Sequence, residues 1–545
     1  MPRMTGNRYL AEALRAYGVD HLFFVPSVLG GAMRLMDGVG IKRVVTHGEK
    51  AAAYMADGYA RASHRPGICL CQDIGTTNLA AGLRDPYMAC SPVIAISGGQ
   101  ADQPRYRHAY QNAEDFTAWE GVTKANFSVD SVQRLPDLLR QAFRVATSGS
   151  PGPVHLELRG NSGQMLDGEA DFELVAEERF ARYPAFRPEP DAGAVSEAAD
   201  LLAQASRPII VAGGGVVSSG AAAEVVKLAE RLSIPIATSL NAKEVVPDGH
   251  PLAVGVPGSY SRWCANRAVS EADLVVFIGS HTGGQVTNTW QVPKIGTPTI
   301  QIDIEADELG RNYPNSASLQ GDARVATQKL IDAVESQPPR HQWLERVQGF
   351  VREYWAESEP LRNSDDVPIR PERICKELTD WLPAESALVC DTFHAAIWTA
   401  QMVRFSKPGQ RYIRCAGSLG WGLPGTLGIK AAMPDKPVIG FSGDAGFYYH
   451  IGELETAVRM GLNAVMVVNN NYSGGVGETS PFERGVSLAK VAEDFGCFGI
   501  RVEEPSEIRP ALDNALAAGR PAVVEIVSDT NIRAKRGWAP GEVDH

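Results

Sequence analysis

The sequence predicts an α/β protein made of three doubly wound parallel-sheet domains. Short apolar runs alternate with helix-like stretches along nearly all of the 545 residues. This alternation is typical of strands joined by crossover helices in a parallel sheet. Two irregular stretches, near residues 160–190 and 336–370, interrupt it and mark domain boundaries. A chain of this length has room for roughly three domains.

The first domain is predicted to span residues 1–165. A helix is expected over residues 7–17, and a second, alanine-rich helix follows Glu49. In an open parallel sheet, functional groups gather at the carboxyl ends of the strands. Buried strands are expected at five apolar runs, which are residues 21–25, 42–46, 67–72, 92–97 and 154–158.

The second domain is predicted to span residues 190–335. A strand that begins near Pro208 runs into three glycines at residues 213–215. A glycine turn after a strand can hold a nucleotide phosphate, but the complete G-x-G-x-x-G pattern is missing here. A purely structural domain therefore stays the alternative. Later strands are expected at residues 234–238, 274–279 and 299–304.

The third domain is predicted to span residues 365–530, followed by a tail over 531–545. A charged helix over residues 342–355 and a polar linker over 357–371 lead into it. The basic tail either closes over a site for an anionic group or is a solvated terminus. Strands of this domain are expected at residues 387–391, 438–441, 464–468, 500–502 and 522–527.

Composition and charge exclude several classes of protein. The net charge of −12 argues against a nucleic-acid or anionic-membrane partner. No apolar run is long enough to span a bilayer, and the N-terminus lacks the apolar core of a signal peptide. The eight cysteines show no metal-binding or redox spacing. We therefore expect reduced thiols and a cytoplasmic location.

The stretch 443–473 has the pattern of a strand–helix–strand unit with polar residues after both strands. Asp444 follows one apolar run, and Asn469, Asn470 and Asn471 follow the next. Because parallel strands end at the same edge of a sheet, the carboxylate and the amides should lie side by side. Their oxygens suit Mg²⁺, which also accepts phosphate ligands. An ordinary turn beside a chance cluster of asparagines is the alternative.

These residues resemble the diphosphate-binding motif of the thiamine-diphosphate (ThDP) enzymes. The match is Gly443-Asp444-Ala445-Gly446 followed by Asn470-Asn471, with the departure that Ala445 intervenes before the second glycine. The resemblance implies that Asp444, Asn471 and the backbone carbonyl of Ser473 hold Mg²⁺. It also implies that four small residues meet the cofactor, which are Gly443, Ala445, Gly446 and Gly475.

Glu49 is expected to be catalytic. It opens a helix whose sequence, EKAAAYMADGYAR, closely resembles the pyrimidine-domain helix of ThDP enzymes. The resemblance implies that Glu49 shares a proton with N1′ of the cofactor's aminopyrimidine, which enables loss of the proton from thiazolium C2. An acidic residue that only complements the helix dipole is the alternative.

Further stretches resemble the same family. The stretch 415–424 (CAGSLGWGLP) implies that the carbonyl of Gly417 accepts a hydrogen bond from the cofactor's amino group. It also implies that Leu419 wedges beneath the bent cofactor. For His394 the resemblance implies a phosphate donor, and a loop histidine satisfied by its neighbours is the alternative. The other residues assigned to the cofactor are Pro26, Gly75 and Asn78.

Several positions depart from the family pattern or carry an alternative. Ser27 stands where the family has glycine, and Asp73 and Ile74 replace a Gly-Pro pair, which alters the cavity near the thiazolium. Gln111 resembles an active-site glutamine of the acetolactate synthase group, and a solvated loop residue is the alternative. Lys124 matches that group's V-T-K, although lone lysines lie mostly at the surface.

The resemblance covers nearly the whole chain and implies a ThDP- and Mg²⁺-dependent enzyme, similar to acetolactate synthases, 2-hydroxyacyl-CoA lyases and oxalyl-CoA decarboxylases. The substrate is expected to be a small 2-oxo acid, with carboligation of pyruvate as the first interpretation and an acyl-CoA or another 2-oxo acid as the second. Relatives carry FAD, ADP or nothing in the middle domain. His281 stands where flavin-binding relatives have an arginine, so FAD or ADP is unsupported and a purely structural domain is favoured. The cofactor lies between subunits in the family, which implies a homodimer or homotetramer. A catalytically silent regulatory subunit is the remaining alternative.

Overall fold

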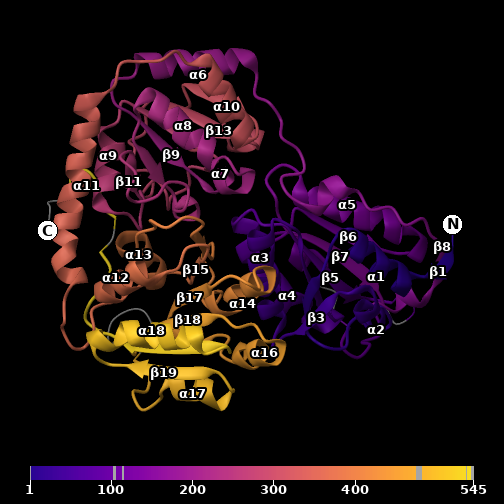
Figure 1. The fold of residues 1–545 in the computed structure, drawn as a ribbon. Helices are drawn as coiled ribbons and strands as arrows, with labels where there is room; N and C mark the ends of the chain where they lie inside the picture. The colour runs from indigo at the N-terminus through magenta and orange to yellow at the C-terminus, as the bar shows by residue number, and fades with distance from the viewer. Residues whose placement is uncertain are drawn as a thin grey trace.

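The computed structural model describes residues 2–101, 103, 106–112, 116–473, 481–535 and 537–541. Within these residues the chain forms three six-stranded parallel sheets flanked by helices, which confirms the predicted fold class. The sheets lie in three lobes, coloured indigo to purple, magenta, and orange to yellow in Figure 1. The boundaries expected at residues 165, 190, 335 and 365 stay predictions. Among the described helices, none is long and apolar enough to cross a membrane.

The N-terminal sheet has the strand order β3-β2-β4-β5-β7-β6. Its strands are β2 (His21–Phe24), β3 (Lys42–Val45), β4 (Gly67–Cys71), β5 (Val93–Gly99), β6 (Ala125–Val129) and β7 (Val154–Arg159). Its helices are α1 (Gly6–Ala16), α2 (Gly30–Met36), α3 (Glu49–Ser63), α4 (Thr76–Met88) and α5 (Leu135–Thr147). The central strands are continuous apolar runs because helices cover both faces of the sheet. A short antiparallel pair, β1 (Arg3–Thr5) with β8 (Glu169–Asp171), lies at the outer end of this lobe (Figure 1).

The middle sheet has the strand order β11-β10-β9-β12-β13-β14. Its strands are β9 (Pro208–Ala212), β10 (Ile236–Thr238), β11 (Ala253–Gly255), β12 (Leu274–Ile278), β13 (Thr299–Asp303) and β14 (Ala317–Gln320). Its helices are α6 (Ala192–Gln204), α7 (Gly214–Ser219), α8 (Ala222–Leu232), α9 (Trp263–Glu271) and α10 (Ala323–Ala333). The chain winds outward from β9 and then restarts at β12. The direction of winding therefore reverses between these two strands, where open α/β sheets bind ligands.

The C-terminal sheet has the strand order β16-β15-β17-β18-β20-β19. Its strands are β15 (Ala387–Cys390), β16 (Arg411–Arg414), β17 (Val438–Gly443), β18 (Val465–Asn470), β19 (Phe498–Val502) and β20 (Ala522–Val527). Its helices are α12 (Pro371–Trp381), α13 (His394–Met402), α14 (Gly422–Ala432), α15 (Asp444–Tyr448), α16 (Glu453–Met460), α17 (Leu488–Asp494) and α18 (Ile508–Ala517). Since β17 and β18 pair in parallel, Asp444 and the asparagines end at the same edge, as expected.

Within the three six-stranded sheets, four strands are absent from the sequence-based expectations, namely β6, β11, β14 and β16. Each lies at an edge of its sheet. Edge strands are covered less completely by helices, so they lack the continuous apolar run that marks a central strand. In β14, for example, buried and exposed residues alternate.

The predicted polar linker begins too early. The long helix α11 (His341–Arg362) includes residues 357–362 and continues past Pro360. Its last turn packs because the guanidinium groups of Arg362, Arg262 and Arg404 lie 5.2, 4.7 and 4.8 Å from the ring centre of Trp355. Figure 1 shows α11 running along the side of the molecule from the middle lobe to the C-terminal lobe.

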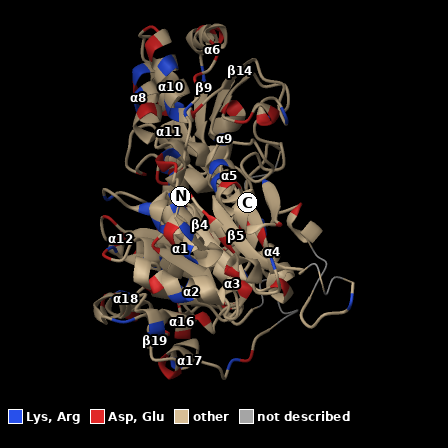
Figure 2. Cartoon of the chain, turned by 90° about the vertical axis from the view of Figure 1, so that its right-hand side faces the viewer, with Lys and Arg blue, Asp and Glu red and all other residues tan. Residues whose placement is uncertain are grey.

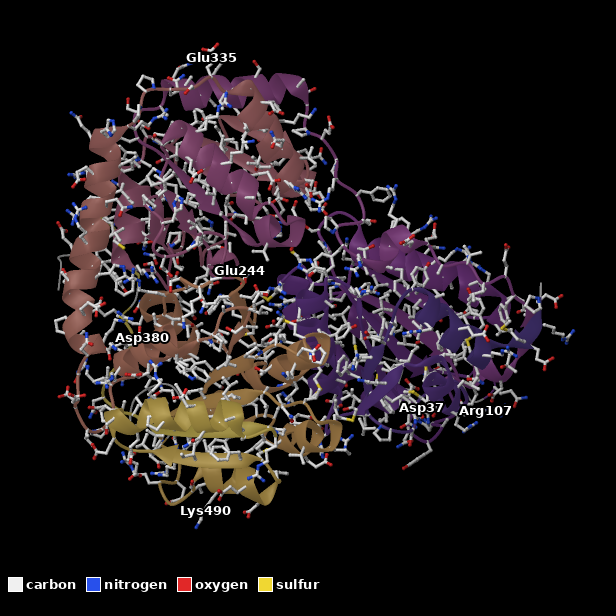
Figure 3. All side chains as sticks on the ribbon, in the orientation of Figure 1. Asp37, Arg107, Glu244, Glu335, Asp380 and Lys490 are labelled. Carbon is white, nitrogen blue, oxygen red and sulfur yellow. The ribbon has the colours of Figure 1, made fainter. Side chains whose placement is uncertain are left out.

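The middle domain is tied to the C-terminal domain by polar contacts. Arg262 donates hydrogen bonds to the carbonyls of Gln401 and Val403, at 3.1 and 3.0 Å. Glu244, which Figure 3 places where the two lobes meet, accepts the backbone N–H of Tyr412 at 2.5 Å. On the molecule's exposed helices, acidic and basic residues are intermixed (Figure 2).

The C-terminal tail lies across this same contact. The side chain of Gln401 donates to the carbonyl of Lys535 at 2.8 Å, and Asn266 donates to the carbonyl of Trp538 at 2.7 Å. The tail therefore connects two domains and is not a free solvated terminus over these residues. Arg536 lies outside the described residues.

The N-terminal and C-terminal domains share one hydrophobic core. Buried side chains of α3 and α14 belong to the same continuous cluster, and α3 is buried on all sides from Ala51 to Ala60. The two helices approach so closely that a Cβ at Gly58 would lie 2.3 Å from the carbonyl oxygen of Gly425. Only glycine allows this crossing.

A charged network lies at the centre of that helix contact. Arg61 donates to both carboxylate oxygens of Asp57, at 2.9 and 2.7 Å. The indole N–H of Trp421, from the C-terminal domain, donates to Asp57 at 2.9 Å. Asp57 and Trp421 have no exposed surface. The network thus joins the two domains by hydrogen bonds to a fully buried charge.

Trp421→Phe is expected to lower the free energy of unfolding by about 1.5–3 kcal/mol, because it removes a buried hydrogen bond to a charged group. Trp263→Phe is the matched control, since the Trp263 indole donates to Glu357 at 3.0 Å near the surface. The control should lose less than about 1 kcal/mol. Denaturant unfolding followed by circular dichroism measures both losses, and equal losses would contradict this account.

Candidate functional site

The predicted metal-binding residues lie together at the ends of β17 and β18. The carboxylate of Asp444 accepts the backbone N–H of Ala445 at 2.7 Å and that of Ser473 at 3.2 Å. The amide oxygen of Asn471 accepts the same Ser473 N–H at 3.2 Å. The backbone N–H of Ser473 thus lies between the carboxylate of Asp444 and the side-chain oxygen of Asn471.

The other two asparagines have structural contacts. Asn470 donates to the buried carboxylate of Glu525 at 2.8 Å and accepts the backbone N–H of Tyr472 at 3.1 Å. The side-chain oxygen of Asn469 is buried and has no hydrogen-bond partner among the described residues. Thr530, at the start of the tail, donates to the carbonyl of Asn471 at 2.7 Å. Asn471 is therefore the asparagine whose side chain faces Asp444.

The chemistry of these donors fits a hard divalent cation. Burial raises the pKa of Asp444 to about 6, although backbone N–H groups donate to it and act in the opposite direction. A buried carboxylate held only by backbone donors gains most from a bound positive charge. Carboxylate, amide and carbonyl oxygens are the ligands that Mg²⁺ takes in proteins. Open space lies next to Gly443 and Gly417, because a Cβ on either residue would meet no atom of the described chain within 4 Å.

The Gly417 loop, residues 415–420, is held by two buried carboxylates. Asp391 accepts the backbone N–H groups of Gly420 at 3.2 Å and Gly422 at 3.0 Å. Asp85, from α4 of the N-terminal domain, accepts three consecutive N–H groups of the loop at 2.8–3.0 Å. Gly417 is left exposed and Leu419 half-buried, so both remain accessible to a ligand.

The start of α13 borders the same region. Phe393 adopts φ 58° and ψ −127°, a conformation that strongly favours glycine, and its ring is exposed. His394 follows it as the first residue of the helix. Burial and the nearby Arg533 lower the pKa of His394, so the imidazole is neutral at pH 7. A neutral histidine can still donate one hydrogen bond to a phosphate.

Glu49 lies at the carboxyl edge of the N-terminal sheet, at the first position of α3. The side chain of Asn78 donates to its carboxylate at 3.4 Å. A Cβ at Gly75 would lie 2.6 Å from the same carboxylate, so Gly75 packs directly against the Glu49 side chain. The three residues predicted at this edge therefore do meet.

Two other predicted residues lie on neighbouring loops. Gln111 has φ 58° and accepts a hydrogen bond from the side chain of Gln72 at 3.1 Å. Pro26 follows β2 and is exposed. Ser27 has φ 74°, so serine occupies a left-handed position where the family pattern has glycine.

Among the described residues, no hydrogen bond or ion pair joins Glu49 to the C-terminal half of the site, although the neighbouring His47 N–H donates to Glu453 of that domain at 2.9 Å. The Gly417 loop docks beside Asp57 and Asp85, and Asp57 lies about 12 Å along α3 from Glu49. The contacts found for Glu49 in the described part of the chain come from its own domain. One chain therefore presents two half-sites, one around Glu49 and one around Asp444.

Some expectations fall elsewhere. Gly475 lies outside the described residues. The ammonium group of Lys124 donates to the carbonyls of Val145, Ser148 and Ser150, at 3.0, 2.7 and 2.7 Å. These contacts hold the end of α5, so the structure gives Lys124 a structural role away from both half-sites.

Sequence reasoning missed the carboxylates that shape the site. Asp57 and Arg61 could have been suspected, because their i, i+4 spacing on an apolar helix predicts a buried ion pair. Asp85 carries no such signal, since the loop N–H groups that it accepts lie more than 300 positions away in the sequence.

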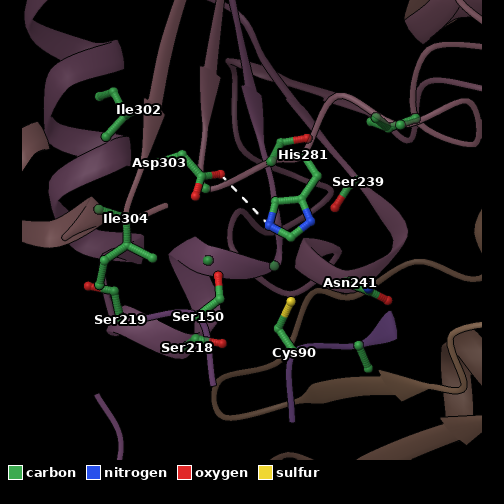
Figure 4. A pocket seen from close by; sticks show the side chains of 18 of the residues that line it. Cys90, Ser150, Ser218, Ser219, Ser239, Asn241, His281, Ile302, Asp303 and Ile304 are labelled. Carbon is green, nitrogen blue, oxygen red and sulfur yellow. Dashed lines mark ion pairs between the residues drawn. The ribbon is translucent and has the colours of Figure 1, made fainter. Parts of the chain in front are cut away.

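A cavity of about 250 Å³ lies in the middle domain, beyond the carboxyl ends of β9, β12 and β13 (Figure 4). It sits where the winding of the sheet reverses, and residues of the N-terminal and middle domains line it. Burial raises the pKa of Asp303, whose carboxylate is 4.0 Å from the ring of His281. Its lining includes Cys90, Ser150, Gly214, Ser239, Asn241, Gly279 and Gln285.

Comparisons with known proteins agree with this arrangement. Models of the thiamine pyrophosphate (ThDP) enzymes match residues 4–119 as the N-terminal TPP binding domain, 195–330 as the central domain and 392–526 as the C-terminal TPP binding domain. The probable acetolactate synthase large subunit of Methanocaldococcus jannaschii is 32% identical over 96% of this chain and 92% of its own length. The acetolactate synthase isozyme 1 large subunit of Escherichia coli is 27% identical over 99% and 96%. The chain therefore belongs to the thiamine pyrophosphate enzymes and is an acetolactate synthase-like, ThDP-dependent member of that family.

Proposed function

We propose that the enzyme condenses 2-oxo acids, with pyruvate as donor, in a reaction that depends on ThDP and Mg²⁺. The main support is the meeting of Asp444, Asn471 and Ser473 in a chain that resembles acetolactate synthase large subunits along its whole length. When bound, ThDP supplies a nucleophilic carbon that adds to the carbonyl group of a 2-oxo acid.

The chain's own residues bind and orient the reactants in this proposal. Asp444, Asn471 and the Ser473 carbonyl hold Mg²⁺. Gly417 accepts a hydrogen bond from the amino group of the pyrimidine, and Leu419 supports the ring from below. The cofactor is lined by the turns around Gly75 and at residues 443–446. The other residues assigned to it are Pro26, Asn78, His394 and Gly475. Gln111 faces the substrate, and Glu49 exchanges a proton with the pyrimidine.

Glu49→Gln is expected to abolish CO₂ release from pyruvate, because an amide cannot exchange the proton that activates the cofactor. The assay contains ThDP and Mg²⁺, and acetolactate is measured in the same tube. Glu12→Gln, at a surface position of α1, is the control and should keep full activity. Both variants should unfold at the temperature of the unaltered protein.

The assay also separates the remaining functions. Full activity of Glu49→Gln would contradict the catalytic role. ThDP binding by the unaltered protein without turnover of pyruvate would favour a lyase or decarboxylase that acts on another 2-oxo acid or an acyl-CoA. Activity with any of these substrates would dismiss a catalytically silent subunit.

Asp444→Asn is expected to stabilise the metal-free protein at pH 7 by about 1–2 kcal/mol. The pKa of Asp444 is raised from 3.8 to about 6 in the folded protein, so between these values the folded state binds more protons than the unfolded state. Stability therefore falls as the pH rises from about 4 to 6. The pKa shift alone corresponds to about 3 kcal/mol. The asparagine amide has one acceptor oxygen and cannot accept both backbone N–H groups, so we expect a smaller gain in stability.

Thermal unfolding in EDTA between pH 4 and 7.5 measures this effect. The gain from Asp444→Asn should vanish below about pH 4, where the aspartate is neutral in both states. ThDP with Mg²⁺ should raise the unfolding temperature of the unaltered protein but not that of the variant. A variant that is less stable at pH 7 in EDTA would contradict the argument.

We propose that the active unit is at least a homodimer, in which Glu49 of one chain faces Asp444 of another. The two half-sites lie apart within one chain, and the exposed apolar side chains of Ile74, next to Gly75, and Phe393, next to His394, border them. Contact between chains would cover these side chains and complete two sites in each dimer. A homotetramer would consist of two such dimers.

Complementation tests this arrangement. Chains with Glu49→Gln or Asp444→Asn should each be inactive, but their co-expression in equal amounts should restore about a quarter of the activity, since half of the dimers are mixed and each has one intact site. Sites formed within single chains would give no restoration. A chain carrying both substitutions, co-expressed with the Glu49→Gln chain, is the negative control.

Two further assignments complete the proposal. The middle-domain cavity is the place where FAD or ADP would bind, and its volume of about 250 Å³ suits a mononucleotide better than a dinucleotide. We also propose a cytoplasmic location, because all eight cysteines are free and seven of them are buried. Neither nucleic acid nor a membrane is expected among the partners of this acidic protein.

A further inference from the structure

Arg414 connects the middle-domain cavity with the Gly417 loop. It is the last residue of β16, and only 2% of its surface is exposed. Its guanidinium donates to the carbonyls of Cys415 at 2.6 Å and Ala416 at 2.9 Å. The remaining nitrogen donates to the side-chain oxygen of Gln285 at 2.8 Å. All three acceptors are uncharged. Because the Arg414 guanidinium is buried, each of the three hydrogen bonds contributes substantially to stabilising its charge.

The loop is thereby held from two sides. Arg414 binds the carbonyls of Cys415 and Ala416, while Asp85 binds the N–H groups of Ala416, Gly417 and Ser418. These contacts fix the peptide planes that lead into Gly417. The direction of the Gly417 carbonyl, the proposed acceptor for the pyrimidine amino group, follows from those planes because a peptide unit is rigid.

Gln285 is the middle domain's contribution to this arrangement. It lines the cavity and is exposed, although its backbone carbonyl is fixed by the N–H of Ser259 at 2.8 Å. An exposed side chain of this kind contributes little to the stability of the fold. Its amide nevertheless determines whether the third donor of a buried guanidinium is satisfied.

We propose that Gln285 is a positioning residue for the cofactor, acting through Arg414 on the Gly417 loop. The inference rests on the proposed role of Gly417. Without the Gln285 oxygen, Arg414 must turn toward another acceptor or water, and its hold on the two loop carbonyls changes. The loop then no longer presents the Gly417 carbonyl in one direction, and the affinity for ThDP falls.

The test compares the ThDP dissociation constants of three variants in saturating Mg²⁺, measured by isothermal titration calorimetry. Gln285→Leu keeps the size of the side chain but removes the acceptor, and it should weaken ThDP binding about five- to tenfold. Gln285→Glu keeps an acceptor oxygen and should bind ThDP within about twofold of the unaltered protein. Asn241→Leu is the control, because Asn241 lines the same cavity (Figure 4) and is not among the described acceptors of Arg414.

The unfolding temperature without ThDP should be the same in all of these proteins. Unchanged ThDP affinity in Gln285→Leu would overturn the inference. Equal weakening in Asn241→Leu, or a parallel loss of thermal stability, would also overturn it, since the effect would then come from the cavity's shape. If the unaltered protein bound no ThDP, the proposed function would be wrong and this inference with it.

Discussion

One carboxylate, that of Asp85, determines how the Gly417 loop of the C-terminal domain is presented. It accepts three consecutive backbone N–H groups and lies 3.2 Å from Arg61. A loop with several glycines would otherwise populate many backbone conformations. The hydrogen bonds to a buried charge select one of them, and they come from a different domain. The geometry of the C-terminal half-site therefore depends on the correct docking of α4 and α14.

The two half-sites differ in their physical character. Asp444 is buried and has no cationic partner within the described chain. The half-site around Asp444 therefore carries an unfavourable electrostatic free energy, which a bound metal ion would remove. Glu49 is half-buried beside Asn78 and Gly75, and the contacts described for it come from its own domain.

Much of the fold follows from local sequence patterns. Every predicted strand at the centre of a sheet exists, because a strand covered on both faces must be continuously apolar. The edge strands β6, β11, β14 and β16 were missed, since half-covered strands carry mixed residues. The linker prediction over 357–371 failed at its start because packing of Arg362 on Trp355 outweighs the helix-breaking tendency of Pro360.

The candidate site likewise contains residues that the sequence could predict and residues that it could not. Glu49, Asp444 and Asn471 could be predicted, since each sits at a strand end within a recognisable motif, and the structure brings the expected neighbours together. Asp85, Arg414 and Gln285 could not, because their importance comes from contacts between residues that are distant in the sequence. A motif records which groups touch a ligand. It does not record which buried groups hold the backbone that presents them.

The buried network of Asp57, Arg61 and Trp421 has a consequence for the independence of the domains. If the N-terminal domain were expressed alone, the carboxylates of Asp57 and Asp85 would face Arg61 without the indole and the loop amides that share their charge. The excised C-terminal domain would expose the apolar face of α14 to water. Two segments separated by about 200 residues of middle domain thus form one cooperative folding unit. The chain has three lobes, but the first and last of them stabilise each other through a shared core although they are not adjacent in the sequence.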